Sequence, residues 1–317
     1  MDRRQSIKAI AGVVAGAATY RVANAQTRKY LMATGTVGGT FYPLGAAIAK
    51  TVSQYVPRID MSIQSTGASS ENCRLLGTQK VEFGLSGSLV ATDAFNGKEP
   101  FSKAYSNIRA IGYIYPDVSQ WLVMSNSNIN SLEALRGKRI GVGPVGSGAQ
   151  GASKLILEFA GLSDKDYTAV MLPFGQSADR MRDTQLDAAN FFLASPNATV
   201  IDLTTMHNVR ILPISGELRA RIQAKYPDYV SVTIPAGTYK GVDKDIETVA
   251  WASCLFTREE IPAEDVYQIT KAIYTHAEDI AKVHPAGKSI KVADLKKGIN
   301  IPFHEGAMKF LKENGLA

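Results

Sequence analysis

A glycine-rich stretch near the start of the chain has the residue types needed to hold a small anion. Gly35 to Gly45 reads GTVGGTFYPLG and joins a short apolar strand, Tyr30 to Ala33, to a helical run from Pro43 to Val56. Glycines let a ligand approach the backbone closely, and the first turn of a helix presents unpaired N–H groups at the positive end of the helix dipole. These features predict a cradle for an anion or carboxylate, although any tight strand-to-helix turn also needs glycine.

Two further helix starts repeat this arrangement. Ser65 to Asn72 (STGASSEN) opens a helix that either Ser69 or Ser70 can cap, and Gly143 to Ala149 (GPVGSGA) precedes another helix. No glycine-rich loop is followed by Gly-Lys-Ser/Thr, and no G-x-G-x-x-G has an acidic ribose partner at the usual distance. The three helix starts are therefore predicted to share a cleft for a small carboxylate, and not to hold the phosphate of a nucleotide.

The extreme N-terminus has the pattern of a secretory signal. A basic head, Arg3 to Lys8, precedes a short apolar run, Ala9 to Ala18, and the small-x-small sequence Ala23-Asn24-Ala25. The run is well short of the roughly 18 to 20 apolar residues that span a membrane, so a retained anchor is not expected. We expect residues 1–25 to be a signal peptide, with a twin-arginine route left open, and the mature protein to be periplasmic.

Charge and cysteine content fit an exported globular protein. Removal of residues 1–25 takes away four basic residues and one acid, which lowers the formal charge from +6 to +3. The remaining lysines and arginines form no basic stripe, so a nucleic-acid partner is not expected. Cys73 and Cys254 lie in apolar contexts that favour two buried thiols, although export also permits a disulfide.

Strands and helices alternate along the first part of the chain, which predicts an α/β fold with a mainly parallel sheet. A buried strand that begins at Ile108 is expected to end at Pro116, after which a second series of strands and helices starts. Residues 212–242 contain three prolines, so long regular elements are not expected there. We expect residues 26–119 and 249–317 to form lobe 1 and residues 120–248 to form lobe 2.

The motifs together resemble the TAXI family (TRAP-associated extracytoplasmic immunogenic proteins), the periplasmic receptors of tripartite ATP-independent transporters. The resemblance covers essentially the whole mature chain, and it is carried by Thr34–Gly45, Gly67–Leu76, Leu132–Gly148, Asp187-Ala188 and Ile301–Gly315. It implies a type II periplasmic-binding-protein fold, in which two lobes joined by two crossing strands close over a small solute. It also implies ligands such as glutamate, related dicarboxylates or other small organic acids and amino acids, delivered to a TRAP-type membrane permease.

The resemblance further implies which residues line the ligand site. From the two lobes these are Gly38, Gly39, Thr40, Phe41, Tyr42 and Ser69, and Gly146, Ser147, Gly148 and Ala149. Ser88, Phe192 and Ser195 complete the expected set. Two departures make the pocket less polar than is usual in the family: Gly87-Ser88-Leu89 replaces Gln-Ser-Asp, and Ala194 stands where glycine is commoner. Phe191 and Phe192 would lie on opposite faces of a strand, so at most one should face the cleft.

Catalytic residues are not recognisable in the sequence. The four histidines are widely spaced and lie in no H-E-x-x-H or C-x-x-C setting, so no metal site is expected. Ser147 is flanked by glycines but lies outside a G-x-S-x-G elbow, and no histidine can be named as its partner. We predict a monomeric binding protein without a cofactor. The alternatives are a receptor that signals to a membrane partner and an enzyme on the same two-lobed scaffold.

Overall fold

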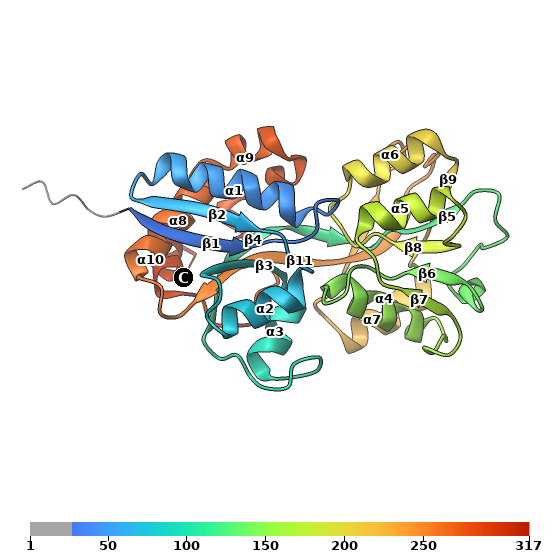
Figure 1. The fold of residues 1–317 in the computed structure, drawn as a ribbon, viewed down its shortest axis with the longest axis horizontal. Coiled ribbons are helices and arrows are strands. Elements are labelled where there is room, and N and C mark those ends of the chain that lie inside the picture. The colour runs from blue at the N-terminus through green and yellow to red at the C-terminus, as the bar shows by residue number, and fades with distance from the viewer. Residues whose placement is uncertain (1–26, 317) are drawn as a thin grey trace, which may run out of the picture.

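The computed structural model describes residues 27–316, which form two α/β lobes side by side along the long axis of the molecule (Figure 1). Within these residues, the first of two sheets has six strands in the order β10-β11-β3-β1-β2, with β4 paired to β11. The second sheet has five strands in the order β7-β6-β8-β5-β9 and lies in the second lobe. The predicted signal peptide lies outside the described residues. The two-lobed α/β fold expected from the sequence is confirmed.

The strands are β1 (Arg28–Ala33), β2 (Ile59–Gln64), β3 (Phe83–Gly87), β4 (Ile108–Val118), β5 (Trp121–Met124), β6 (Arg139–Gly141), β7 (Thr168–Val170), β8 (Ala188–Asn190), β9 (Val209–Leu212), β10 (Val230–Ile234) and β11 (Ile246–Arg258). The α-helices are α1 (Phe41–Tyr55), α2 (Ser69–Gly77), α3 (Ser88–Asn96), α4 (Gly148–Phe159), α5 (Phe174–Arg182), α6 (Ala198–Met206), α7 (Gly216–Lys225), α8 (Ala263–Thr275), α9 (Ala277–Val283) and α10 (Glu305–Glu313). None of the helices in residues 27–316 combines the length and the apolar character needed to cross a membrane.

The central strands of the first sheet are buried on both faces, whereas its edge strands β2 and β10 are partly exposed. β1 pairs in parallel with β2 and β3, and successive residues of β1 belong to different packing clusters. Met32 packs with α1, α8, α9 and α10, whereas Ala33 packs with α2 and α3. A parallel strand that is covered on both faces reads as a continuous apolar run, which is why β1 could be recognised in the sequence.

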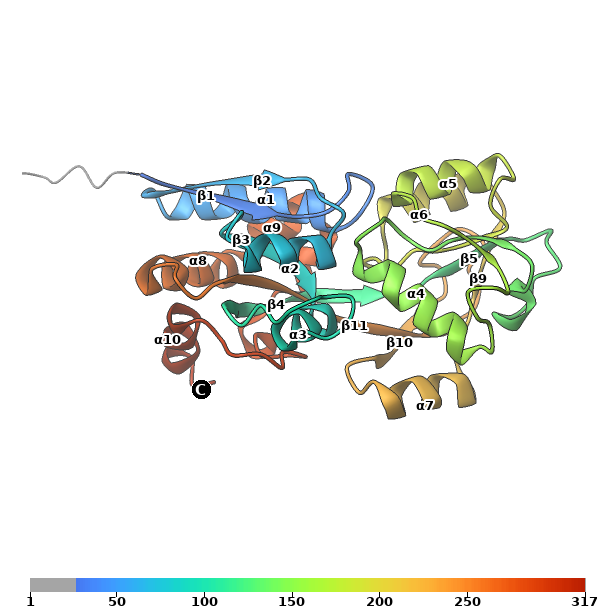
Figure 2. The ribbon, with the colours of Figure 1, turned by 60° about the horizontal axis from the view of Figure 1, so that its bottom comes forward.

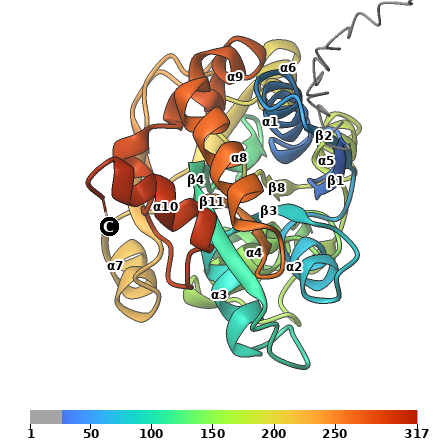
Figure 3. The ribbon, with the colours of Figure 1, turned by 90° about the vertical axis from the view of Figure 1, so that its left-hand side faces the viewer.

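The C-terminal segment packs closely on the first lobe. Figure 3, which looks along the long axis, shows α10 beside α8. This contact requires a glycine, because a Cβ atom at Gly306 would lie 2.1 Å from the carbonyl oxygen of Ala263. His304 caps α10, with its Nδ1 accepting a hydrogen bond from the N–H of Gly306 (3.1 Å). His304 therefore has a structural role at a helix start.

Two long antiparallel strands, β4 and β11, run from the first lobe towards the second (Figures 1 and 2). The prediction that the strand starting at Ile108 ends at Pro116 is wrong, because β4 continues to Val118. Proline is tolerated there since β4 has β11 as its only strand partner in the described sheet, so the missing N–H costs no ladder hydrogen bond on the other side.

The prediction for residues 212–242 is also wrong, because α7 and β10 form there. The prolines lie between the regular elements and do not interrupt them. Pro213 precedes α7, Pro227 separates α7 from β10, and Pro235 follows β10. Proline restricts its own residue and the one before it, so two prolines 14 residues apart leave room for a helix of 10 residues.

Both cysteines are buried, unbonded thiols. Cys73 lies on α2 and Cys254 on β11, and burial raises the pKa of the Cys73 thiol to about 12. Such thiols stay protonated and behave as small apolar groups. The interpretation of both cysteines as core residues is confirmed.

Candidate ligand-binding site

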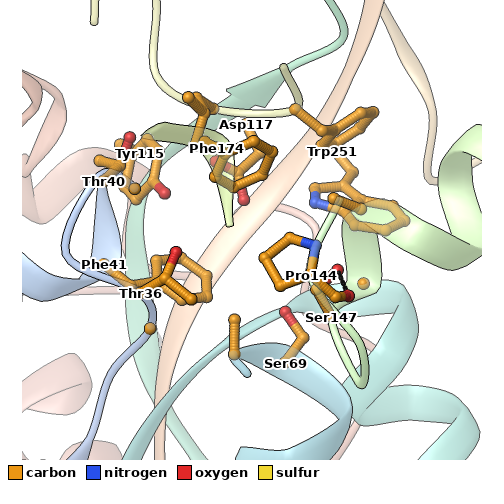
Figure 4. Close-up of a pocket in the computed structure, with 17 residues that line it drawn as sticks. Thr36, Thr40, Phe41, Ser69, Tyr115, Asp117, Pro144, Ser147, Phe174 and Trp251 are labelled. Atoms are coloured by element: carbon orange, nitrogen blue, oxygen red, sulfur yellow. Dashed lines mark hydrogen bonds between the residues drawn. The ribbon is translucent and has the colours of Figure 1, made fainter. Parts of the chain in front are cut away.

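A cavity lies between the lobes, beside the crossing strands (Figure 4). Its walls come from the loop before α1, the starts of α2 and α4, strands β4 and β11, and Phe174 and Phe192 of the second lobe. Its free space totals about 400 Å³ when the opening to solvent is included, but the centre of a water molecule fits into only about 30 Å³ of it. As it stands, the cavity suits a solute of few non-hydrogen atoms.

The structure brings eight of the predicted site residues to the cavity wall: Gly39, Thr40, Phe41, Ser69, Ser147, Gly148, Ala149 and Phe192. Five others lie outside the described lining: Gly38, Tyr42, Ser88, Gly146 and Ser195. The hydroxyl of Ser195 lies 3.4 Å from that of Tyr239 in the second lobe, and Ser88 is buried at the start of α3. The loop before α1 and the start of α4 thus supply most of the residues that sequence reasoning placed at the site.

Hydrogen bonds join the two lobes around the cavity. The Gly146 carbonyl oxygen accepts hydrogen bonds from the N–H groups of Ser70 (3.1 Å) and Glu71 (3.2 Å) at the start of α2. The Thr199 hydroxyl donates to the Gly38 carbonyl oxygen (2.9 Å). The lobes are therefore closed on each other. Gly38 and Gly146 belong to the contact between the lobes, which explains why neither lines the cavity.

At the start of α2 only the N–H of Ser69 lacks an acceptor among the described residues, whereas at the start of α4 two successive N–H groups lack one. Ser147 caps the helix, with its hydroxyl oxygen accepting a hydrogen bond from the N–H of Gln150 (3.1 Å). The N–H groups of Gly148 and Ala149 donate to no acceptor in residues 27–316, and both residues line the cavity. An unpaired helix start that faces a cavity favours a bound anion.

The floor of the cavity contains a buried acid that the sequence analysis missed. Asp117 is 6% exposed, and its Oδ2 accepts a hydrogen bond from the Ser253 hydroxyl (2.5 Å). Its Oδ1 has no hydrogen-bond partner in the described chain. Burial raises the pKa of Asp117 to about 6, and the neighbouring Ser253, Tyr115 and Trp251 partly oppose this shift. An acid of this kind in a cavity is a candidate for ligand binding.

The strand register explains how Asp117 reaches the cavity. Asp117 lies opposite Trp251, and Tyr115 lies opposite Ser253, on the paired strands β4 and β11. Because side chains alternate along a strand and opposite residues share a face, these four side chains project from one face of the pair. The spacing of Tyr115 and Asp117 was available in the sequence. It was overlooked because Pro116, between them, was interpreted as the end of the strand.

Aromatic rings form much of the remaining wall. The ring centres of Trp251 and Phe192 lie 4.6 Å apart, and Phe41 meets Tyr115 edge to face at 6.1 Å. Trp251 is 3% exposed, and its indole N–H has no acceptor within the described residues. Of the two adjacent phenylalanines, only Phe192 is part of the lining, whereas Phe191 packs on Phe174. The lining described here contains no lysine, arginine or histidine.

Comparisons with known proteins agree with this architecture. A model of the NMT1-like family matches residues 32–315. The periplasmic aliphatic sulphonate binding protein SsuA from Escherichia coli is 15% identical, with a TM-score of 0.51 over 90% of this chain and 83% of that one. The alkanesulfonate-binding protein SsuA from Xanthomonas axonopodis pv. citri, solved with MOPS, is 16% identical, with a TM-score of 0.50 over 92% and 94%.

A protein from Bordetella bronchiseptica RB50 is 15% identical, with a TM-score of 0.55 over 92% of this chain and 99% of that one. At such identities the likeness concerns the fold. It confirms the type II periplasmic-binding-protein fold predicted from the sequence.

Proposed function

The chain belongs to the NMT1-like family, and from that premise we propose that it is a solute receptor that captures a small carboxylate between its lobes and delivers it to a membrane permease. The observation that carries the proposal is the start of α4, where Gly148 and Ala149 line a cavity between the lobes and their N–H groups have no acceptor in residues 27–316. A carboxylate there would gain charge-assisted hydrogen bonds and the favourable end of the helix dipole.

Residues of the first lobe would complete the site. The N–H of Phe41, at the start of α1, has no acceptor in the described part of the chain, and Thr36 offers a hydroxyl group without a partner there. Both residues line the cavity. A ligand held by α4 on one side and by this loop on the other would favour the closed arrangement, because it makes both sets of contacts only when the lobes meet.

The side chains around the cavity support binding and not catalysis. Ser147 donates its hydroxyl hydrogen to the Pro144 carbonyl oxygen (2.6 Å), so it has no base that would activate it as a nucleophile. No histidine lines the cavity in the described structure. We therefore propose that the protein is a receptor and not an enzyme.

We assign the receptor to the TAXI type, and its partner to a TRAP-type permease, because of the resemblance carried by segments such as Thr34–Gly45 and Ile301–Gly315. The N-terminal pattern from Arg3 to Ala25 supports export to the periplasm. We also propose that residues 26–119 and 249–317 move as one lobe and residues 120–248 as the other, about the crossing strands β4 and β11.

Thermal-shift screening of residues 26–317 tests the ligand class. The panel contains small organic acids, amino acids, alkanesulphonates, for which two structural relatives are named, and neutral sugars. A ligand that binds only the folded protein at 100 times its Kd adds about 2.7 kcal/mol of stability, which is a readily measured rise in Tm. We expect carboxylates to raise Tm. A rise with neutral solutes alone would contradict the proposed role of α4.

Proteoliposomes test the partner class. Vesicles that contain a TRAP-type permease should take up the ligand only when the purified receptor is added outside and an ion gradient is imposed. Receptor with the cavity blocked by Ala149→Trp serves as the control. Uptake that needs ATP and ignores the ion gradient would assign the receptor to another class of transporter.

A further inference from the structure

Asp117 is not explained by capture of a simple carboxylate. It is buried at the floor of the cavity, and the described lining supplies no cation to balance its charge. A ligand with only negative charge would place a second anion in the same enclosed space, where like charges repel strongly. The site therefore has one end that suits an anion, at α4, and one end that disfavours it, at Asp117.

The free oxygen of Asp117 indicates what the second end binds. Oδ2 is already engaged by Ser253, whereas Oδ1 lacks a hydrogen-bond donor among residues 27–316. A buried carboxylate oxygen without a donor is costly, and a positively charged N–H donor is the partner that offsets that cost best. The aromatic rings of Tyr115 and Trp251, which also line the cavity, are suitable neighbours for a cation.

Trp251 adjoins both ends of the site. A Cβ atom placed on Gly148 would lie 3.0 Å from the ring of Trp251, and Trp251 is the residue opposite Asp117 in the strand register. The start of α4 and the strand pair that carries Asp117 therefore both adjoin the indole ring of Trp251. An α-amino acid is the most compact ligand that offers both charged groups, because both are attached to one carbon atom, and the free space of the cavity is small.

We propose that the ligand is a small α-amino acid, whose ammonium group binds Asp117 and whose carboxylate binds the start of α4. This inference rests on the proposed function, because it takes carboxylate capture as given and adds the cationic group. It makes Asp117 the residue that separates amino acids from hydroxy acids and dicarboxylates of similar size. The limited free space of the cavity favours ligands with short side chains.

Calorimetric titration of wild-type protein with matched ligand pairs tests the inference. The pairs are glycine and glycolate, L-alanine and L-lactate, and L-glutamate and 2-hydroxyglutarate, with 4-aminobutyrate as a probe whose charges are far apart. We expect the amino member of at least one pair to bind about 30-fold or more tightly than its hydroxy partner, as a charged hydrogen bond implies. We expect 4-aminobutyrate to bind weakly or not at all.

Asp117→Asn supplies the test on the protein. It keeps the shape of the side chain and removes its charge, so affinity for the amino acid should fall about 30-fold or more while affinity for the hydroxy acid is kept or improved. Asp93→Asn is the matched control, because Asp93 is a partly buried acid on α3 outside the cavity. If Asp117→Asn fails to fold, the ligand pairs with wild-type protein still decide.

The outcomes separate the two proposals. Equal or tighter binding of the hydroxy acids to wild-type protein, or unchanged amino-acid affinity in folded Asp117→Asn, would overturn the role of Asp117 and leave carboxylate capture standing. Failure of every carboxylate to bind wild-type protein would overturn the proposed function itself.

Discussion

The starts of α2 and α4 look alike in the sequence but have different surroundings in the structure. Both follow a loop rich in glycine and serine, and both begin a helix at the boundary between the lobes. At α2 the N–H groups of Ser70 and Glu71 donate to the Gly146 carbonyl oxygen of the other lobe, whereas at α4 those of Gly148 and Ala149 have no acceptor in residues 27–316, and both residues line the cavity. The same local signal thus serves closure in one place and, in our proposal, ligand binding in the other.

The largest effect is expected from a charge at the start of α4. Ala149→Asp places an acid at the cavity wall, where it would repel the ligand carboxylate, so affinity should fall by roughly 100-fold or more. Because Ala149 is buried, the unpaired carboxylate should also lower the free energy of unfolding, so stability is measured beside affinity. Ala149→Asn is the control for size, and titration calorimetry with thermal unfolding measures both properties. Equal affinity of the Asp and Asn variants would remove the start of α4 from the anion site.

A smaller loss is expected from a variant that opposes closure at α2 and does not touch the ligand. A Cβ atom at Gly67 would lie 2.4 Å from the Val145 carbonyl oxygen of the opposite lobe, so Gly67→Ala should favour the open arrangement. Affinity should fall about tenfold, and small-angle scattering should show a larger radius of gyration at equal ligand concentration. Gly151→Ala is the control, because nothing lies within 4 Å of a Cβ atom there. Wild-type affinity and radius in Gly67→Ala would show that this contact does not govern closure.

Stability and amino-acid affinity are expected to depend on pH in opposite directions. Asp117 and Tyr115 are the titratable residues of the described lining, and burial keeps Tyr115 neutral by raising its pKa well above 10. The pKa of Asp117 is raised from 3.8 to about 6, so the folded protein binds this proton more tightly than the unfolded chain does. The contribution of Asp117 to the stability of the unliganded protein should therefore decline as pH rises from about 4 to about 6.

Amino-acid affinity should change in the opposite direction over the same range. It should rise by up to about tenfold per pH unit until Asp117 is ionised, because an ammonium ligand needs the charged carboxylate. Melting curves and titrations of wild type and Asp117→Asn across this range measure both trends, and the difference between the two proteins isolates Asp117. If stability and amino-acid affinity changed in the same direction over this pH range, the proposed binding of the ligand ammonium group by Asp117 would be contradicted.

The smallest effects concern how the two helices are capped. Ser147→Ala removes the side-chain cap of α4 and should cost about 1 kcal/mol in the free energy of unfolding. The residue at the same position of α2 is Ala68, which has no capping side chain and a φ of 80°. Ala68→Gly relieves that backbone conformation and should be neutral or stabilising by up to about 1 kcal/mol. Denaturant unfolding compares the two, and equal losses in both variants would contradict this difference between the caps.

The sequence was sufficient for the fold class and for the helix starts that border the candidate site, but not for the end of β4 or for α7 and β10. The conformation of the apolar strand β1, and of the glycine-rich turns before α1 and α4, is determined by residues adjacent in the sequence. A strand and two helix starts were therefore predicted correctly there. The function of Gly146 depends on which lobe its carbonyl oxygen meets, and no local pattern carries that information. Asp117 and Trp251 lie more than a hundred residues apart and come together only through the register of β4 and β11.

A crystal structure with the amino acid that binds most tightly in the titrations tests the central claim most directly. The account predicts ligand density between the lobes, with the ammonium group within hydrogen-bond distance of Asp117 Oδ1 and the carboxylate at the N–H groups of Gly148 and Ala149. Density outside this cavity, or a ligand with its carboxylate directed at Asp117, would contradict it.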